Sequence, residues 1–351
     1  MEEKQHKRRV HYSGKYPKKF EEKYKEKDPE KYRETVERVI SKGSTPAGMH
    51  ISIMVNEILD FLKIAPGMQG LDCTLGYGGH TMKMLEKLKG DGCIYGLDVD
   101  PIESEKTVER IRKAGFLEDS FKFRLINFAN IDKVAEEAGR FDFVLADLGV
   151  SSMQIDDPSR GFSYKTDGPL DLRLDPKHGE SAAERLHKIT EQEFIGMMME
   201  NSDEPYAEEI AEKVFDIMKK GGPMDTTTAL RNAIESALDK LPVEDKKEVV
   251  KKSCARVFQA LRIDVNSEFE VLYSFLEKLP DILNPGARVA ILTFHSGEDR
   301  LVKKSFKALK KAGVYSEVSD DVIRPSAEEC RLNPRSKSTK MRWAVRADSC
   351  H

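Results

Sequence analysis

The sequence predicts an α/β protein in which an inserted all-helical domain interrupts a mostly parallel sheet. Before residue 150, short apolar runs alternate with amphipathic segments, a pattern typical of parallel strands joined by crossover helices. From residue 181 to 261 the apolar spacing is helical, and strand-like runs resume only near residue 289. The chain therefore has one sheet built from two separated stretches of sequence.

Composition narrows the class of protein. The chain has 351 residues and a net charge of -3, so overall charge does not point to a nucleic-acid partner. It contains no run of about 18 apolar residues and no apolar signal-peptide core, so we expect neither a membrane span nor secretion. Its five cysteines form no C-x-x-C pair and have no metal-ligand spacing. We expect a soluble, cytoplasmic protein without a metal site.

The chain is organised around residues 69–101. A strand over 71–74 runs into a glycine turn that includes Gly78 and Gly79, and a second strand over 93–97 ends at Asp98. Such a turn lets backbone approach a ligand closely, and a carboxylate at the next strand tip suits ribose hydroxyls. The third spaced glycine of the dinucleotide fingerprint is missing. The turn thus favours S-adenosylmethionine (SAM) over NAD, with a turn in another kind of α/β protein as the alternative.

Two more strands complete the first half of the sheet. A strand over 122–126 leads to Phe128, which could contact an adenine ring or pack in the core, and a strand over 141–148 carries Asp147 near its end. Ligands of open α/β sheets bind outside the carboxyl ends of the strands. We therefore expect Asp72, Asp98 and Asp147 to meet at one crevice.

The second half of the chain is less regular. Residues 149–175 read as a long, ordered loop and residues 181–261 as the helical insert, in which Asp225-Thr226 is a helix cap. We expect one long helix over 258–279, an N-P-G turn at 284–286 and a fifth strand over 289–294. A helix over 301–312 and two strands, 314–318 and 341–345, complete the sheet.

Both ends of the chain carry basic segments. Residues 1–45 hold 14 Lys and Arg against 9 Asp and Glu, with interleaved aromatics. This segment could be an RNA-contacting arm, or a charged tail with a helix near residues 29–41. Residues 324–346 hold 7 basic residues against 2 acidic ones, and we expect phosphate contacts from Arg324, Arg331, Arg335, Lys337, Lys340 and Arg342.

Eight motifs occur in order: D-C-T-L-G-Y-G-G-H, L-D-V-D-P, A-D-L-G-V-S-S-M-Q-I-D, R-G-F-S-Y, D-G-P-L-D-L-R-L-D, F-Q-A-L-R-I-D-V-N-S-E, F-H-S-G-E-D-R-L-V-K and N-P-R-S-K-S-T-K-M-R. On these motifs the chain, from residue 50 to about 347, resembles the bacterial small-subunit rRNA cytosine-N(4)-methyltransferase family (RsmH, also called MraW). The resemblance implies a class I SAM-dependent methyltransferase fold, with SAM as cofactor and a cytidine in the decoding region of 16S rRNA as substrate. The partner would be 16S rRNA or the small ribosomal subunit.

The resemblance also implies boundaries and roles. Four segments follow: a basic extension (1–48), a first methyltransferase part (49–152), a helical substrate-recognition insert (153–256) and a second methyltransferase part with the basic segment (257–351). The cofactor residues would be Gly78, Gly79, His80, Asp98, Phe128, Asp147 and Gln154. His80 and Gln154 rest mainly on the resemblance.

Methylation of an exocyclic amine needs alignment and acceptors for the amino hydrogens. We expect these acceptors in the loop after the fourth strand, from Asp147 to Ser151 and Ser152. Asp171 or His295 could hold the ring or take the proton. An internal ion pair of Asp171 with Arg173 is an equal alternative, and we expect Asp299 to pair with Arg300.

Several positions depart from the family pattern. Gly297 stands where a leucine is usual, K-S-C-A-R-V replaces H-P-A-T-R before residue 258, and residues 203–207 replace a G-E-E-R-F-A-type segment. The basic extension is also unusual. Two alternatives therefore stay open: a paralogue that methylates a different RNA nucleotide, and a SAM-binding ribosome-assembly factor.

Overall fold

The computed structural model describes residues 52–239 and 245–348. The expectations for the N-terminal extension lie outside these residues. Within them, no helix is both long enough and apolar enough to cross a membrane.

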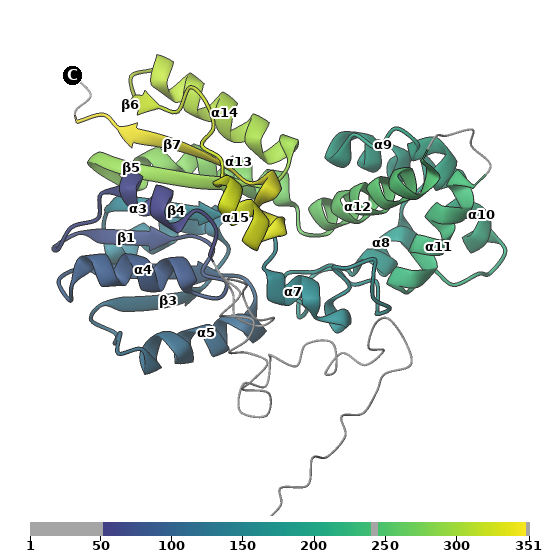
Figure 1. Cartoon of the computed structure of the whole chain (residues 1–351), viewed down its shortest axis with the longest axis horizontal. Helices are drawn as coiled ribbons and strands as arrows, with labels where there is room; N and C mark the ends of the chain where they lie inside the picture. Colours follow the sequence, from purple (N-terminus) through teal and green to yellow (C-terminus); the bar gives the residue numbers. More distant parts are fainter. Residues whose placement is uncertain (1–51, 240–244, 349–351) are drawn as a thin grey trace, which may run out of the picture.

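A seven-stranded sheet forms the centre of the larger lobe (Figure 1). Its strands are β1 (Gln69–Asp72), β2 (Cys93–Asp98), β3 (Phe121–Leu125), β4 (Phe141–Asp147), β5 (Leu283–Thr293), β6 (Tyr315–Val318) and β7 (Lys340–Arg346), in the spatial order β3-β2-β1-β4-β5-β7-β6. Strands β1 to β5 pair in parallel, and β7 runs antiparallel to both β5 and β6. The carboxyl ends of β1, β2 and β4 therefore share one edge.

Helices cover both faces of the sheet and bury two apolar clusters. One face carries α3 (Val55–Leu62), α4 (Gly79–Leu88) and α5 (Pro101–Lys113). The other carries α6 (Ile131–Ala138), α13 (Glu268–Lys278) and α14 (Ser296–Lys311). Strand β4 is apolar on both sides, because Phe141 and Val144 face one cluster while Phe143 and Leu145 face the other, as expected for a central parallel strand.

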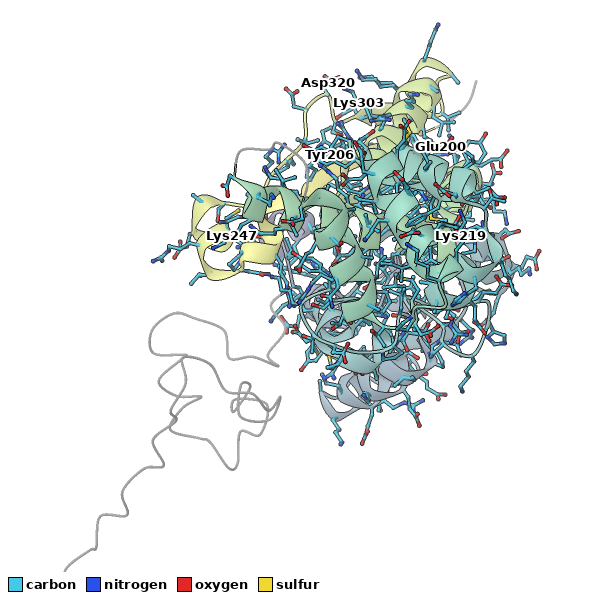
Figure 2. The ribbon with its side chains drawn as sticks, turned by 90° about the vertical axis from the view of Figure 1, so that its right-hand side faces the viewer. Glu200, Tyr206, Lys219, Lys247, Lys303 and Asp320 are labelled. Carbon is cyan, nitrogen blue, oxygen red and sulfur yellow. The ribbon has the colours of Figure 1, made fainter. Side chains whose placement is uncertain are left out.

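The helical lobe has a third apolar cluster of its own. It is built from α8 (Ala182–Lys188), α9 (Glu191–Ser202), α10 (Ala207–Lys219), α11 (Thr227–Leu238) and the long α12 (Lys246–Val265). The hydroxyl of Thr226 accepts a hydrogen bond from the backbone N–H of Ala229, so the predicted cap of α11 is confirmed. Figure 2 looks onto this lobe, with Lys219 and Lys247 at its outer surface.

Two predicted elements are wrong in detail. The helix expected over 258–279 is broken into α12 and α13, because Ser267 adopts a left-handed conformation (φ 49°) and the Asn266 side chain bonds to the backbone of Leu172 and Leu174. Strand β5 begins at Leu283, before the N-P-G sequence, and its register with β4 shifts between Phe141 and Phe143. The extra residues are accommodated as an irregularity within the strand rather than as a turn before it.

Candidate active site

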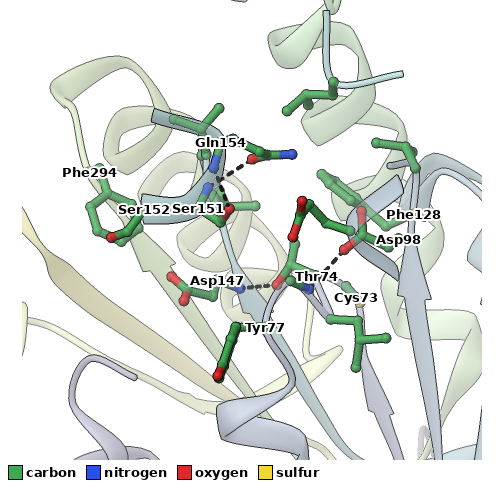
Figure 3. Close-up of a pocket in the computed structure, with 18 of the residues that line it drawn as sticks. Cys73, Thr74, Tyr77, Asp98, Phe128, Asp147, Ser151, Ser152, Gln154 and Phe294 are labelled. Carbon is green, nitrogen blue, oxygen red and sulfur yellow. Dashed lines mark hydrogen bonds between the residues drawn. The ribbon is translucent and has the colours of Figure 1, made fainter. Parts of the chain in front are cut away.

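A cavity of about 380 Å³ opens at the carboxyl ends of β1, β2 and β4 (Figure 3). Its walls come from the glycine turn, the strand tips, the loop after β4, the α12–α13 junction and the segment around Asn333. Ten of the residues predicted from sequence line it: Gly78, Gly79, His80, Asp98, Phe128, Asp147, Ser151, Ser152, Gln154 and Arg335. The acidic side chains of Asp98 and Asp147 face the same space, as the strand order requires. The third acid expected there, Asp72, does not line the cavity, because its buried side chain accepts a hydrogen bond from the Thr81 hydroxyl.

The two glycines of the turn are needed for packing within the protein. Gly78 has φ 79°, and a Cβ there would lie 2.8 Å from Cγ2 of Thr107 on α5. A Cβ on Gly79 would overlap the side chain of Ser52. Tight packing therefore explains these glycines at least as directly as close approach to a ligand.

Asp98 is held in a fixed orientation at the tip of β2. Its two carboxylate oxygens accept hydrogen bonds from the backbone N–H groups of Gly76 (2.8 Å) and Asp100 (2.9 Å). Burial raises the pKa of Asp98 to about 6 despite these bonds. Phe128 lies nearby and packs edge-on against Phe275 at 5.3 Å, so it both lines the cavity and belongs to the apolar packing.

Asp147 is the least satisfied acid of the cavity. Its Oδ1 is buried without a hydrogen-bond partner among the described residues, and Oδ2 lies 3.6 Å from Nδ1 of His80. Burial raises the pKa of Asp147 to about 6, against the lowering effect of His80. Nε2 of His80 lies 2.8 Å from the carbonyl oxygen of Ile53, which directs Nδ1 toward the carboxylate.

Gln154 braces the loop after β4. Its side-chain oxygen accepts from the backbone N–H of Ser151 while its backbone N–H donates to the Ser151 hydroxyl, a capping box at the start of α7 (Ser152–Asp156). Its Nε2 donates to Asp100, which also pairs with the buried Arg160 at 2.7 Å. The polar atoms of Gln154 are therefore largely occupied within the protein, which fixes Ser151 beside Asp147.

Sequence reasoning gave no role to a second polar group that lines the cavity. This group consists of Arg262, Asn266, Glu268 and Glu298, all lining the cavity. Arg262 makes a two-pronged pair with Glu268 (2.7 and 2.8 Å). The signal was present, because these residues belong to the quoted F-Q-A-L-R-I-D-V-N-S-E and F-H-S-G-E-D-R motifs.

His295, which was predicted to hold the base or take the proton, does not line the cavity, but it forms a close pair with Glu298, which does. Nε2 of His295 lies 3.2 Å from Oε1 of Glu298. Burial alone would raise the pKa of Glu298, but His295 and then Arg262 outweigh it and leave that pKa below its ordinary value. Oxygen and nitrogen atoms of Glu268, His295 and Glu298 lie within 4.8 Å of one another. Because Arg262 already engages both oxygens of Glu268, a positive charge is in place there without a metal ion.

Some predicted site residues lie elsewhere or have other partners. Asp171 does not line the cavity; it pairs with Arg173 at 2.7 Å, so the structural alternative fits its position. The expected pair of Asp299 with Arg300 is wrong, because Asp299 binds Lys340 and Arg342 instead.

The six basic residues predicted to contact phosphates divide into four that are exposed and two that are more buried. Arg324, Arg331, Arg335 and Lys337 are exposed, with Arg335 paired to Asp156 across the rim of the cavity. The prediction of phosphate contacts is corrected for Lys340 and Arg342, because both have a partner within the protein. The Arg342 side chain is only 6% exposed, and both cations pair with Asp299.

The unusual Gly297 is explained by its neighbour. A Cβ at this position would lie 2.6 Å from the ring of Phe269, which in turn packs against the His295 ring at 5.8 Å.

We expect Gly297→Leu to lower the free energy of unfolding by about 1–3 kcal/mol, because overpacking forces the ring of Phe269 to move. Denaturant unfolding would measure this change in stability, and the double variant Phe269→Leu/Gly297→Leu is the matched comparison for Gly297→Leu. Equal stability of Gly297→Leu and the unchanged protein would contradict the explanation.

The cavity fits a SAM-type cofactor. A buried, unpartnered carboxylate oxygen in an acidic pocket suits a sulfonium cation, and the held carboxylate of Asp98 suits a ribose. With the strand order and the antiparallel seventh strand, these features define a class I SAM-dependent methyltransferase.

A model of the MraW methylase family matches residues 47–347. The chain belongs to this family. A relative from Agathobacter rectalis, named ribosomal RNA small subunit methyltransferase H 1, is 68% identical and is aligned over 99% of both chains.

Other relatives differ in how much of the chain they cover. One from Alkaliphilus metalliredigens, named ribosomal RNA small subunit methyltransferase H 2, is 56% identical over 98% of this chain and 99% of its own. One from Clostridioides difficile, named without a number, is 36% identical and covers 84% of this chain but 98% of its own. The relatives whose names carry a number, H 1 and H 2, are aligned over nearly the whole of this chain, which indicates that this subgroup shares the N-terminal extension.

Proposed function

We propose that this protein transfers a methyl group from SAM to the exocyclic N4 amine of a cytidine in 16S rRNA. We place it in the cytoplasm, with 16S rRNA or the small ribosomal subunit as its partner. The observation that carries the proposal is the buried Oδ1 of Asp147, which has no partner among the described residues and lies in the same cavity as a loop of polar groups and Arg262. The names of the relatives support an rRNA substrate.

The chemistry divides between the cofactor and the chain. SAM, when bound, supplies an electrophilic methyl group. The cytosine amine is a poor nucleophile because its lone pair is delocalised into the ring, so the protein must hold the amine in line. Oδ1 of Asp147 accepts an amino hydrogen, and the loop through Ser151 and Ser152 supplies further polar contacts. A proton that reaches Asp147 lies close to Nδ1 of His80, 3.6 Å from Oδ2.

We propose that the remaining site residues act around this centre. Gly78, Gly79, Asp98, Phe128 and Gln154 shape the cofactor end. His295, which does not itself line the cavity, acts on the base side through its pair with Glu298. The target nucleotide must leave its stack to enter. The helical insert, residues 153–256, would cover that nucleotide, and exposed Arg324, Arg331, Arg335 and Lys337 would contact phosphates.

Mapping of methylated nucleotides in 16S rRNA tests the proposal. Cells lacking the protein should lose one N4-methylcytidine, and the unchanged protein should restore it, whereas the Asp147→Asn variant should not. Restoration of a methyl group on another nucleotide would favour the paralogue. An unchanged methylation map would contradict the function.

Cofactor affinity should depend on pH. Burial raises the pKa values of Asp98 and Asp147 to about 6 in the free protein, so both carry protons below that pH and lose charge and acceptor capacity. For two such groups we expect SAM to bind about 100-fold more weakly at pH 5 than at pH 8. Calorimetry across this range measures it, and each Asp→Asn variant should remove about half of the logarithmic slope. A flat profile would show that the two acids do not contact the cofactor.

A further inference from the structure

Arg262 is the most firmly held cation of the cavity wall. It lies in the last turn of α12, and its Nε and Nη2 atoms donate to the two oxygens of Glu268 at 2.7 and 2.8 Å. Only 16% of the Arg262 side chain and 13% of the Glu268 side chain are exposed. A two-pronged, charge-assisted pair of this kind fixes the plane of the guanidinium group.

The junction that follows α12 fixes the arginine from its other side. Nδ2 of Asn266 donates to the carbonyl oxygens of Arg262 and Leu172, while Oδ1 accepts from the backbone N–H of Leu174. Backbone and side chain of Arg262 are thus both restrained. Within residues 52–239 and 245–348, its Nη1 group makes no hydrogen bond.

Arg262 and Asp147 belong to the same cavity. Both line it, as does Glu298. Burial is the main cause of the raised pKa of Asp147, and Glu268 is the main charge that raises the pKa of Arg262; the charge of Glu298 adds a smaller effect to both. An acceptor for amino hydrogens and a fixed donor therefore line one cavity, together with Glu298.

We propose that Arg262 selects cytosine at this site by donating hydrogen bonds from Nη1 to N3 and O2 of the base, with Glu268 as its positioning residue. This rests on the proposed function. Cytosine presents acceptors at N3 and O2, next to its amino group, whereas uracil presents an N–H at position 3. A guanidinium group has donors only, so it pairs with cytosine and opposes uracil. A buried site that hydrogen-bonds one pattern strongly rejects the other.

The test combines a base analogue with protein variants. The target cytidine is replaced by 3-deazacytidine, which keeps the amine and O2 but has C–H in place of N3. The unchanged protein should lose about 10- to 100-fold in kcat/KM on the analogue, the range expected for a hydrogen bond to a charged group. Arg262→Met should lose a similar factor on cytidine and show no further loss on the analogue.

Controls separate recognition from a structural clamp between α12 and α13. Arg256→Met changes a partly exposed arginine on the same helix, which approaches Glu204 only to 3.9 Å, and should keep the full dependence on N3. Arg262→Lys retains the charge without the fork and should also lose the dependence on N3. SAM affinity, measured by calorimetry, should be unchanged in all three variants.

The possible outcomes separate failure of the role proposed for Arg262 from failure of the proposed function. If the unchanged protein methylates cytidine and 3-deazacytidine equally, or if Arg262→Met and Arg262→Lys keep the dependence on N3, the role of Arg262 is overturned while the proposed function stands. If the unchanged protein methylates no cytidine, the proposed function itself fails.

Discussion

Asp147→Asn is expected to lower kcat for methyl transfer by about 100-fold or more, the range seen when one preorganised group is removed from a charged transition state. The substitution keeps the shape of the side chain but removes the charge whose Oδ1 lies unpartnered in the cavity. Single-turnover transfer from labelled SAM measures the effect. Asp119→Asn, at an exposed acid that does not line the cavity, is the matched control and should be silent.

The same substitution should stabilise the free protein. Burial raises the pKa of Asp147 from 3.8 to about 6, so the folded state disfavours the ionised form. The contribution of Asp147 to the free energy of unfolding is therefore fully present below pH 4 and is lost as pH rises through 6. One pKa unit corresponds to about 1.4 kcal/mol, so Asp147→Asn should raise the free energy of unfolding by up to about 3 kcal/mol at pH 8. The gain should shrink toward pH 4, and an equal gain at both pH values would refute the cause.

Arg160→Ala is expected to lower the free energy of unfolding by about 3–5 kcal/mol, because it leaves a buried charge without its partner. Arg160 pairs with Asp100, whose side chain is only 1% exposed, and donates to the carbonyl oxygens of Arg173 and Leu174. Leu174 lines the cavity. The variant should therefore lose activity as well as stability, since the loop is no longer tied to the tip of β2.

Two comparisons isolate the buried pair. Arg173→Ala removes a half-buried arginine whose carboxylate partner lies two residues away, and should cost less than about 1 kcal/mol. Asp100→Asn/Arg160→Met replaces both charges, keeps a cap for α5, and should recover much of the stability. Urea unfolding measures all three. A cost of Arg160→Ala no larger than that of Arg173→Ala would contradict this account.

Sequence periodicity predicted the sheet well because parallel central strands leave an unmistakable apolar run. The cluster residues Phe141, Val144 and Leu145 illustrate this for β4. The break at Asn266 could not be read locally, since its cause is a side chain that bonds to a loop 92 residues away in sequence. Periodicity on both sides of the break is helical, and only the tertiary contact ends the helix.

For the site, the sequence was enough to predict which acids lie at the tips of β2 and β4, but it was not enough to predict which residues pair with one another. Asp98 and Asp147 follow from strand order, whereas the binding of Asp299 to Lys340 and Arg342 depends on the pairing of β5 with β7. Two departures from the family pattern also meet in space, because Ser253 donates to Glu204 at 2.9 Å. Such compensation is visible in contacts and leaves no trace in spacing.

The position of the insert has a consequence for synthesis of the chain. Strand β4 pairs with β1 on one side, but its other neighbour, β5, begins only at Leu283. At roughly 5–20 residues per second on the ribosome, an apolar strand edge stays open for about 7 to 27 seconds while the insert is made. An open edge of this kind recruits other chains. A nascent-chain chaperone therefore has its greatest opportunity between the emergence of β4 and that of β5.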